Sequence, residues 1–281
     1  MADTETMDVY WERMSRPWIA HGAAMEAALA PVGAALRAKL SPQPGEAILD
    51  IGPGGGAALL PLAEAVGPTG RIVAVDIAPP MVARAKERLA DYSQVEIRLA
   101  DAGAEPIEAG GFDALSSQFG MMFFADPAAA FARLGSNFRP GARAVFAAWG
   151  LRQENPYFTI AGRVAAARLG PEETRPDPDA PGPFGLQNAE RTLRLLTEAG
   201  FTNADPGTTD LFLAPIGTIE DFAHVMTEIG PAAHRLTALG ADGSERQAMA
   251  NALAAAYREF ETENGILIPA RVHIYSATWP G

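Results

Sequence analysis

Short apolar runs alternate with helically spaced apolar positions between residues 46 and 150. The runs that are typical of buried strands lie at residues 47–51, 71–76, 95–99, 112–117 and 143–149. Apolar residues at spacings of three and four predict intervening helices at residues 59–66, 81–89 and 127–138. Strands separated by helices of about ten residues form parallel sheets with helices on both faces. The pattern therefore predicts an α/β protein with a doubly wound parallel sheet.

Less regular segments flank this core. Residues 1–40 have an apolar stripe with helical spacing, and Pro31 is expected to kink or divide that helix. Residues 171–187 hold five prolines, a composition that predicts a loop or lid. Further along, the pattern predicts a helix at 189–199 capped by Asn188, a strand at 209–214, helices at 219–229 and 245–260, and a closing strand at 271–279.

These elements suggest four parts of one chain. A single core seldom grows beyond about 250–300 residues, so 281 residues fit one elaborated domain. The predicted parts are an N-terminal helical cap (1–40), a ligand-binding core (41–150), a lid or insertion (151–187), and a C-terminal part of the core (188–281) that carries a helical substrate insertion at about 215–268.

Composition narrows the possible functions. The chain has no cysteine, which excludes disulfides, zinc–thiolate sites and cysteine nucleophiles, and no metal site is predicted. The net charge of −12 disfavours nucleic acid and anionic membranes as partners. No basic and apolar leader and no apolar run of about 18 residues is present, so a soluble, cytoplasmic protein is expected.

A glycine cluster is the first candidate site. Gly52-Pro53-Gly54-Gly55-Gly56 follows the first predicted strand and precedes a helix, where free backbone N–H groups collect. The run also satisfies the dinucleotide-binding fingerprint, and Asp76 ends the second strand where an NAD enzyme binds its ribose. This motif alone leaves more than one nucleotide-like ligand open.

Carboxylates at the strand ends distinguish between these candidate ligands. Asp50, Asp76 and Asp101 end the first, second and third predicted strands, which meet at one edge of the sheet. Three acids there would repel a diphosphate, whereas they suit a ligand with an ammonium and a sulfonium group. The pattern favours S-adenosylmethionine and disfavours an NAD-dependent oxidoreductase.

Several segments together resemble a known family. They are Ile48 to Gly56, Val75 to Met81, Ala100 to Ala102 and Phe112 to Pro127. With them, the chain resembles the class I S-adenosylmethionine-dependent methyltransferases, in particular the ubiquinone/menaquinone-biosynthesis-like group. The resemblance implies a seven-stranded Rossmann-like sheet whose last strand is antiparallel. It also implies S-adenosyl-L-methionine as cofactor and S-adenosyl-L-homocysteine as product.

The resemblance assigns cofactor contacts position by position. The backbone of Gly52, Gly54 and Gly56 would surround the methionine portion, and Asp50 would hold the loop and the amino group. Asp76 would contact the ribose hydroxyls, and Ile77 and Met81 would lie beside the adenine. Asp101 and Ala102 would contact the amine and a ring nitrogen of the adenine, and the Ser117 carbonyl would contact the amino group of the methionine portion. Gln118 also belongs to this set, at a position where related sequences more often have arginine.

The acceptor side is less defined in the sequence. His21 and His224 are the candidate general bases, and Tyr10, Trp11 and Trp18 are candidates for an aromatic wall. Apolar insertions predict a small, largely apolar acceptor, such as a polyketide or a quinone-like metabolite, methylated at oxygen, nitrogen or carbon. The alternative is a protein of this fold that binds the cofactor and scaffolds, or catalyses a reaction other than methyl transfer.

Overall fold

The computed structural model describes residues 6–105, 107–171, 177 and 179–281. Within these residues the main sheet has eight strands in the order β3-β2-β1-β4-β5-β10-β6, and β7 also pairs with β10. The strands of this sheet are β1 (Ala47–Ile51), β2 (Arg71–Asp76), β3 (Val95–Leu99), β4 (Phe112–Gln118), β5 (Phe138–Trp149), β6 (Thr202–Asp205), β7 (Thr208–Leu213) and β10 (Ile268–Thr278). A separate short hairpin joins β8 (Glu261–Thr262) and β9 (Gly265–Ile266).

The strand directions confirm the predicted fold class. Strands β1 to β5 pair in parallel, and β10 runs antiparallel to β5. The expected count of seven strands was one too few, because β6 and β7 both pair with β10. Gly207 lies at the break between them with a φ of +49°, against the Ile274 carbonyl. A side chain there would meet that backbone, so the edge divides at this glycine.

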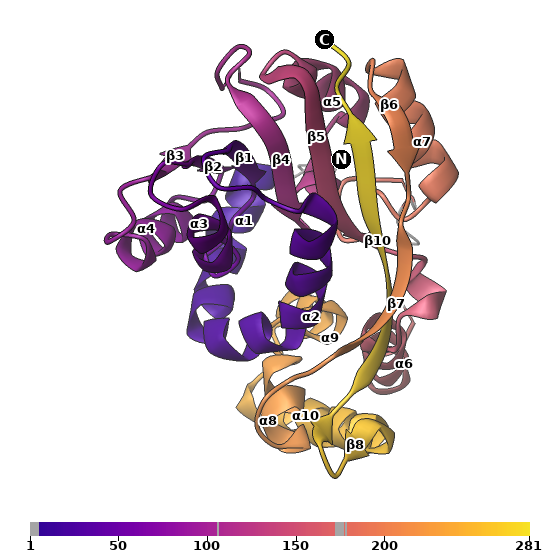
Figure 1. Cartoon of the computed structure of the whole chain (residues 1–281). Coiled ribbons are helices and arrows are strands. Elements are labelled where there is room, and N and C mark those ends of the chain that lie inside the picture. The colour runs from indigo at the N-terminus through magenta and orange to yellow at the C-terminus, as the bar shows by residue number, and fades with distance from the viewer. Residues whose placement is uncertain (1–5, 106, 172–176, 178) are drawn as a thin grey trace.

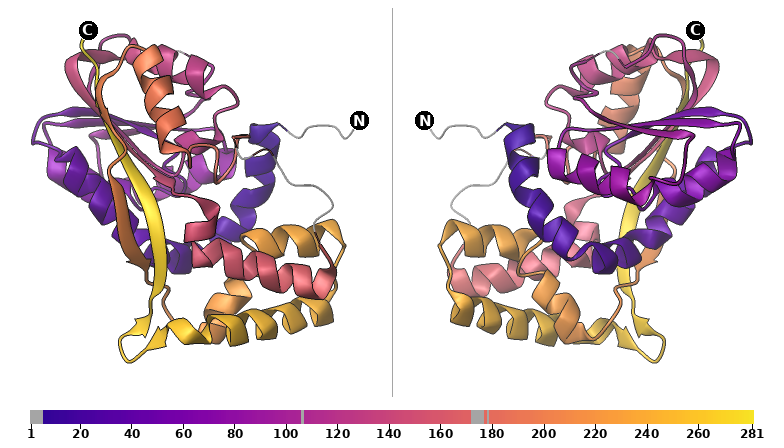
Figure 2. Two further views of the ribbon diagram at one scale, coloured as in Figure 1. Left: turned by 90° about the vertical axis from the view of Figure 1, so that its right-hand side faces the viewer. Right: turned by 90° about the vertical axis from the view of Figure 1, so that its left-hand side faces the viewer.

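Helices cover the sheet and extend beyond one of its edges (Figures 1 and 2). They are α1 (Met7–Ala20), α2 (Gly22–Leu40), α3 (Leu59–Val66), α4 (Pro79–Arg88), α5 (Pro127–Gly135), α6 (Pro156–Leu169), α7 (Ala189–Glu198), α8 (Ile219–Val225), α9 (Pro231–Ala238) and α10 (Gly243–Tyr257). The Asn188 side chain caps α7 as predicted, accepting from the Arg191 N–H at 3.1 Å. The sequence pattern did not indicate α6, and residues 172–176 and 178 of the predicted lid lie outside the described residues.

The two N-terminal helices meet at a sharp corner. Helices α1 and α2 are bent by 97° at His21, whereas α2 continues unbroken through Pro31, where a kink or division was expected. Burial of the apolar face of α2 against the sheet outweighs the local cost of the proline, about 3 kcal/mol. Among the described helices none is by itself long and apolar enough to cross a membrane; only the bent pair α1–α2, taken together, meets that length and composition.

The second helical layer lies beyond the carboxyl ends of the parallel strands. Figure 2 shows α6, α8, α9 and α10 as a block below the sheet, with α1 and α2 alongside. Helices α8, α9 and α10 of this block lie between Leu213 at the end of β7 and Ile268, where β10 begins, whereas α6 follows β5. These two residues are register partners in the sheet. The predicted domain boundaries stay a prediction.

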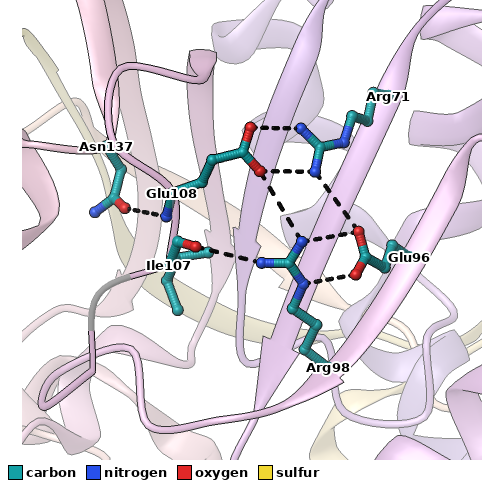
Figure 3. Close-up of polar contacts among 6 residues, drawn as sticks. All are labelled: Arg71, Glu96, Arg98, Ile107, Glu108 and Asn137. Carbon is teal, nitrogen blue, oxygen red and sulfur yellow. Dashed lines mark hydrogen bonds and ion pairs between the residues drawn. The ribbon is translucent and has the colours of Figure 1, made fainter.

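An ionic network links β2 and β3 at one end of the sheet (Figure 3). The Arg71 guanidinium donates twice to Glu108, at 2.8 and 2.7 Å, and Arg98 donates twice to Glu96, at 2.7 and 2.9 Å. The Glu108 N–H donates to the Asn137 side-chain oxygen at 2.8 Å. The network therefore ties β2 and β3 to the segment that leads into β4.

Candidate functional site

A cavity of about 900 Å³ opens at the carboxyl edge of the sheet. This volume lies at the upper end of the range for small-molecule sites. Its lining comes from α1, α2, the glycine cluster, the carboxyl ends of β1, β2, β4 and β5, the segments after β2, β3 and β4, parts of α3, α4 and α5, the first turn of α6, Pro183, and the residues before α9. The three acidic strand ends of the sequence, Asp50, Asp76 and Asp101, all line this one cavity.

The glycines of the cluster differ in position. Gly52 and Gly54 line the cavity, whereas Gly56 does not. A Cβ on Gly52 would lie 2.8 Å from the Gly120 Cα, so the chain following β1 and the chain following β4 pass too closely for a side chain. At Gly56, with a φ of +81°, a Cβ would lie 3.2 Å from the Ala85 Cα of α4. Gly56 thus permits helix packing, and its predicted cofactor contact stays a prediction.

Asp76 connects β2 to the glycine cluster. Its carboxylate accepts from the Gly54 N–H at 3.0 Å and from the Ala78 N–H at 2.9 Å. Burial raises the pKa of Asp76 above its usual value, and these backbone N–H groups oppose the rise. The two bonds fix the carboxylate while leaving lone pairs for a ligand that donates hydrogen bonds.

Asp50 is the most deeply buried acid of the cavity. Its side chain is 3% exposed. Burial raises the pKa of Asp50 to about 7, the Ser116 hydroxyl opposes the rise, and the charge of Asp76 adds to it. Among the described residues neither Asp50 nor Asp76 forms an ion pair. Two buried carboxylates without a cationic partner favour a cationic ligand.

Further predicted contacts lie along the same edge. Ile77 and Met81 line the cavity, as do Asp101 and Ala102 at the end of β3. Asp101 is exposed, and its carboxylate accepts from the Gly103 N–H at 2.8 Å. A flat ligand between Ile77 and Ala102 would therefore meet apolar walls and one acidic rim.

The two predicted residues at the end of β4 have different surroundings. The Ser117 hydroxyl is buried, donates to the Ile51 carbonyl at 2.7 Å and accepts from the Gly120 N–H at 3.2 Å. Ser117 is not among the lining residues, so its predicted carbonyl contact stays a prediction. Gln118 lines the cavity, and its amide donates to the Leu29 carbonyl of α2 at 3.2 Å. Gln118 therefore joins the sheet to the N-terminal helices.

Phe119 was not singled out from the sequence, although it belongs to the cavity. Its φ of +64° is rare for a large residue and costs of order 1–3 kcal/mol. Its ring stacks on Trp149, with centroids 4.5 Å apart and planes 8° apart, and Trp149 stacks on Tyr157 at 6.0 Å and 5°. All three rings line the cavity. Such strain is typical of functional positions, and no local sequence signal reveals it.

The predicted aromatic wall also lies at the cavity. Tyr10, Trp11 and Trp18 are lining residues on α1. The Trp11 ring meets Phe123 edge-on at 4.9 Å, and Tyr10 stacks on Phe123 at 6.4 Å. Helix α1 thus closes the cavity with aromatic side chains.

An ion pair holds α2 against the glycine cluster. Arg88 of α4 donates to the Glu26 carboxylate of α2 at 2.7 and 3.2 Å, and to the Gly55 carbonyl at 2.9 Å. All three residues line the cavity. Helical spacing placed Arg88 on α4, but its partners are distant in sequence, so this contact was not predictable from the pattern.

The two candidate bases lie outside the cavity lining. His21 and His224 are close to one another, with ring centroids 6.1 Å apart, and the His21 Nε2 lies 3.3 Å from the Glu228 carboxylate. His21 occupies the corner between α1 and α2. The two histidines therefore contribute to a contact between the N-terminal helices and α8. We do not include either of them as a general base in the proposed function.

Comparisons with known proteins agree with this geometry. Residues 48–141 match the family model described as a methyltransferase domain. The nocamycin O-methyltransferase of Saccharothrix syringae is 42% identical over 88 residues, which cover 30% of this chain and 30% of that protein. The matches span 24% and 30% of the length of the curated relatives.

Solved structures share the fold. A proposed methyltransferase from Bacillus halodurans C-125 superposes with a TM-score of 0.56 at 16% identity, covering 89% of this chain and 99% of that one. The [4+2]-cyclase SpnF superposes with a TM-score of 0.53 at 17% identity, covering 89% and 80%. At these identities the likeness concerns the fold alone.

Proposed function

We propose that this protein transfers a methyl group from S-adenosylmethionine to a small, largely apolar acceptor, because residues 48–141 match the methyltransferase-domain model and the chain shares its fold with a proposed methyltransferase. The family match and the fold support the class predicted from the sequence. The ubiquinone/menaquinone-like subgroup receives no specific support.

One observation supports S-adenosylmethionine as the cofactor. Asp50 and Asp76 are carboxylates without an ion-pair partner among the described residues, and both line the cavity beside the glycine cluster. The ammonium and sulfonium groups of S-adenosylmethionine would supply the missing positive charge. The space is available as well, because a Cβ on Gly54 would have no atom within 4 Å. A diphosphate would bring negative charge against the same two acids.

The residues have distinct roles in this proposal. Asp50 holds the amino group, Asp76 accepts from the ribose hydroxyls, and Asp101 with Ala102 recognises the adenine. Charge-assisted bonds of this type are worth about 1.5–3 kcal/mol each. Phe119, held by the Trp149 stack, limits the space next to Gly52 and Gly120 in which an acceptor approaches.

The chemistry requires little from side chains. When bound, S-adenosylmethionine would supply an activated methyl group for a nucleophilic atom of the acceptor, its sulfur retaining the bonding electron pair. The protein aligns the acceptor, and orientation of this kind is worth about 7–11 kcal/mol. No histidine lines the cavity within the described residues. Acceptors with an acidic O–H or N–H, which need no histidine base, are therefore favoured.

The acceptor class follows from the lining. Aromatic and apolar side chains of α1, the segment after β4, and α6 make up the part of the cavity beyond the cofactor groups. The match to the nocamycin O-methyltransferase supports an O-methylated secondary metabolite. We therefore propose a polyketide-like or quinone-like acceptor.

Two measurements test the proposal. Calorimetry should detect binding of S-adenosylhomocysteine and none of NAD. Incubation with methyl-labelled S-adenosylmethionine and a panel of phenolic polyketides and hydroquinones should yield labelled products. Binding of NAD in preference to S-adenosylhomocysteine would refute the proposal.

A second candidate function is a reaction without methyl transfer. The absence of a histidine base from the described lining and the shared fold with a cyclase favour it. In that case S-adenosylhomocysteine would bind, acceptors would be converted, and no label would move to the product. The labelled-methyl assay thus separates the two functions.

A further inference from the structure

Tyr157 carries a polar group that the fold itself does not use. The residue lies in the first turn of α6, is 5% exposed, and lines the cavity. Among the described residues its hydroxyl has no hydrogen-bond partner. Among the described residues, every side-chain N or O atom that has no accessible surface has a hydrogen-bond partner. The Tyr157 oxygen has no partner, so it must have some accessible surface, which we assign to the cavity.

The ring of Tyr157 is held rigidly. It stacks on Trp149 and meets Phe158 edge-on at 4.8 Å. Its backbone carbonyl accepts from the Tyr257 hydroxyl at 2.6 Å. A Cβ on Gly230 would lie 3.8 Å from the Tyr157 oxygen, and Gly230 also lines the cavity. The hydroxyl therefore has a fixed position beside an open part of the cavity.

A buried tyrosine hydroxyl normally has a partner. Leaving such a group unpaired costs about 1–3 kcal/mol. Burial raises the pKa of Tyr157 well above its usual value, so the hydroxyl keeps its proton at neutral pH. It therefore acts as a hydrogen-bond donor to a ligand.

The residues around Tyr157 indicate the shape and the charge of that ligand. The Trp149 ring lies nearly parallel to the rings of Phe119 and Tyr157, with interplanar angles of 8° and 5°, and all three residues line the cavity. Aromatic rings pack favourably against a flat π-system, offset-stacked or edge-on. The lining residues that contact Tyr157, namely Trp149, Phe158 and Gly230, are all uncharged. A charged ligand would lose its hydration there without compensation.

We propose that Tyr157 is a specificity-determining residue whose hydroxyl donates a hydrogen bond to a carbonyl or phenolic oxygen of a planar, uncharged acceptor lying against the aromatic rings beside it. This inference rests on the proposed function, because it concerns the acceptor half of the same cavity. It adds the shape, the charge and the polar contact of the acceptor.

A matched pair of probes tests it. 9-Fluorenone and fluorene share one planar tricyclic skeleton and differ in a carbonyl oxygen. Their dissociation constants are measured by equilibrium dialysis with the protein saturated with S-adenosylhomocysteine. One hydrogen bond, together with the unpaired hydroxyl that it satisfies, changes binding by about tenfold. The ratio of the two constants should therefore shift about tenfold toward fluorene in Tyr157→Phe, which keeps the ring stack.

Tyr275→Phe is the control variant. It removes a buried hydroxyl that donates to the Leu186 carbonyl at 2.9 Å and that does not line the cavity. The probe ratio should stay that of the wild type in this variant. The melting temperature of Tyr157→Phe should equal or exceed that of the wild type, since an unpartnered hydroxyl is lost, whereas Tyr275→Phe should melt lower.

Each other outcome contradicts the inference. An unchanged ratio in Tyr157→Phe, a lower melting temperature of that variant, or failure of both probes to bind would overturn it. Failure of S-adenosylhomocysteine to bind would instead count against the proposed function, and the probe ratio measured without it would still test Tyr157.

Discussion

Asp50 should make cofactor binding depend on pH. Burial, reinforced by the charge of Asp76, raises the pKa of Asp50 from 3.8 to about 7. In the free protein Asp50 therefore holds a proton below pH 7 that the unfolded chain has released above pH 4. Stability from this group decreases as the pH rises from about 4 to 7. An ammonium group placed beside Asp50 would stabilise its ionised form.

The magnitude follows from that pKa. A ligand that requires the carboxylate must displace the proton, so affinity should fall about tenfold for each pH unit below 7 and level off above it. The ligand's own amino group stays protonated below pH 7 and adds no slope there. Below pH 7, binding of S-adenosylhomocysteine should release close to one proton.

The assay is titration calorimetry at pH 5.5, 6.5, 7.5 and 8.0. Repeating each titration in two buffers of different ionisation enthalpy gives the number of protons released. Asp50→Asn should bind more weakly at pH 8, by about tenfold or more, and without the slope. Asp76→Asn should keep a slope with a lower midpoint, because one source of the raised pKa of Asp50 is gone.

An affinity that is constant from pH 5.5 to 8, with no proton release by the folded protein, would refute this reasoning. So would a slope that persists unchanged in Asp50→Asn. Circular dichroism at each pH verifies that the protein stays folded.

Further predictions concern single positions. Gly54→Ala and Gly56→Ala both introduce the strain of a positive φ, but only the Gly56 Cβ would meet α4, so Gly56→Ala should lower stability more and Gly54→Ala should weaken S-adenosylhomocysteine binding more; calorimetry and urea unfolding compare the two variants, and equal effects would contradict this. Phe119→Gly should be more stable than Phe119→Ala by about 1 kcal/mol in urea unfolding, since only glycine accepts φ +64° without strain; the opposite order would exclude strain. Glu108→Gln should lower stability by about 1 kcal/mol or less, decreasingly so in high salt, without changing cofactor affinity; an affinity loss would place the network in the site.

The features of the fold and of the site that could be predicted from the sequence are those determined by residues close together in the chain. Alternating apolar runs fixed the parallel strands, Asn188 marked the start of α7, and the acids after β1, β2 and β3 indicated one shared edge. Each of these depends on residues that are neighbours in the chain. A short strand, a cap and a strand-end acid are therefore visible in a single sequence.

The remaining features depend on contacts between distant segments. The pairing of Arg88 with Glu26, the stack of Phe119 on Trp149, and the exposure of the Tyr157 hydroxyl to the cavity each need the tertiary structure. His21 illustrates the reverse case. Its aromatic neighbours suggested a place at the cavity, but the corner between α1 and α2 turns it toward Glu228.

The adjacency of Leu213 and Ile268 has a consequence for how such a protein diversifies. The whole excursion between them begins and ends on neighbouring strands, so its two attachment points are as close as those of a hairpin. A different helical module grafted onto the same two points would leave the sheet and its acidic edge unaltered. Of the described lining residues only Ile229 and Gly230 belong to this excursion, so such an exchange would alter one wall of the cavity and leave the residues proposed to hold the methyl donor in place.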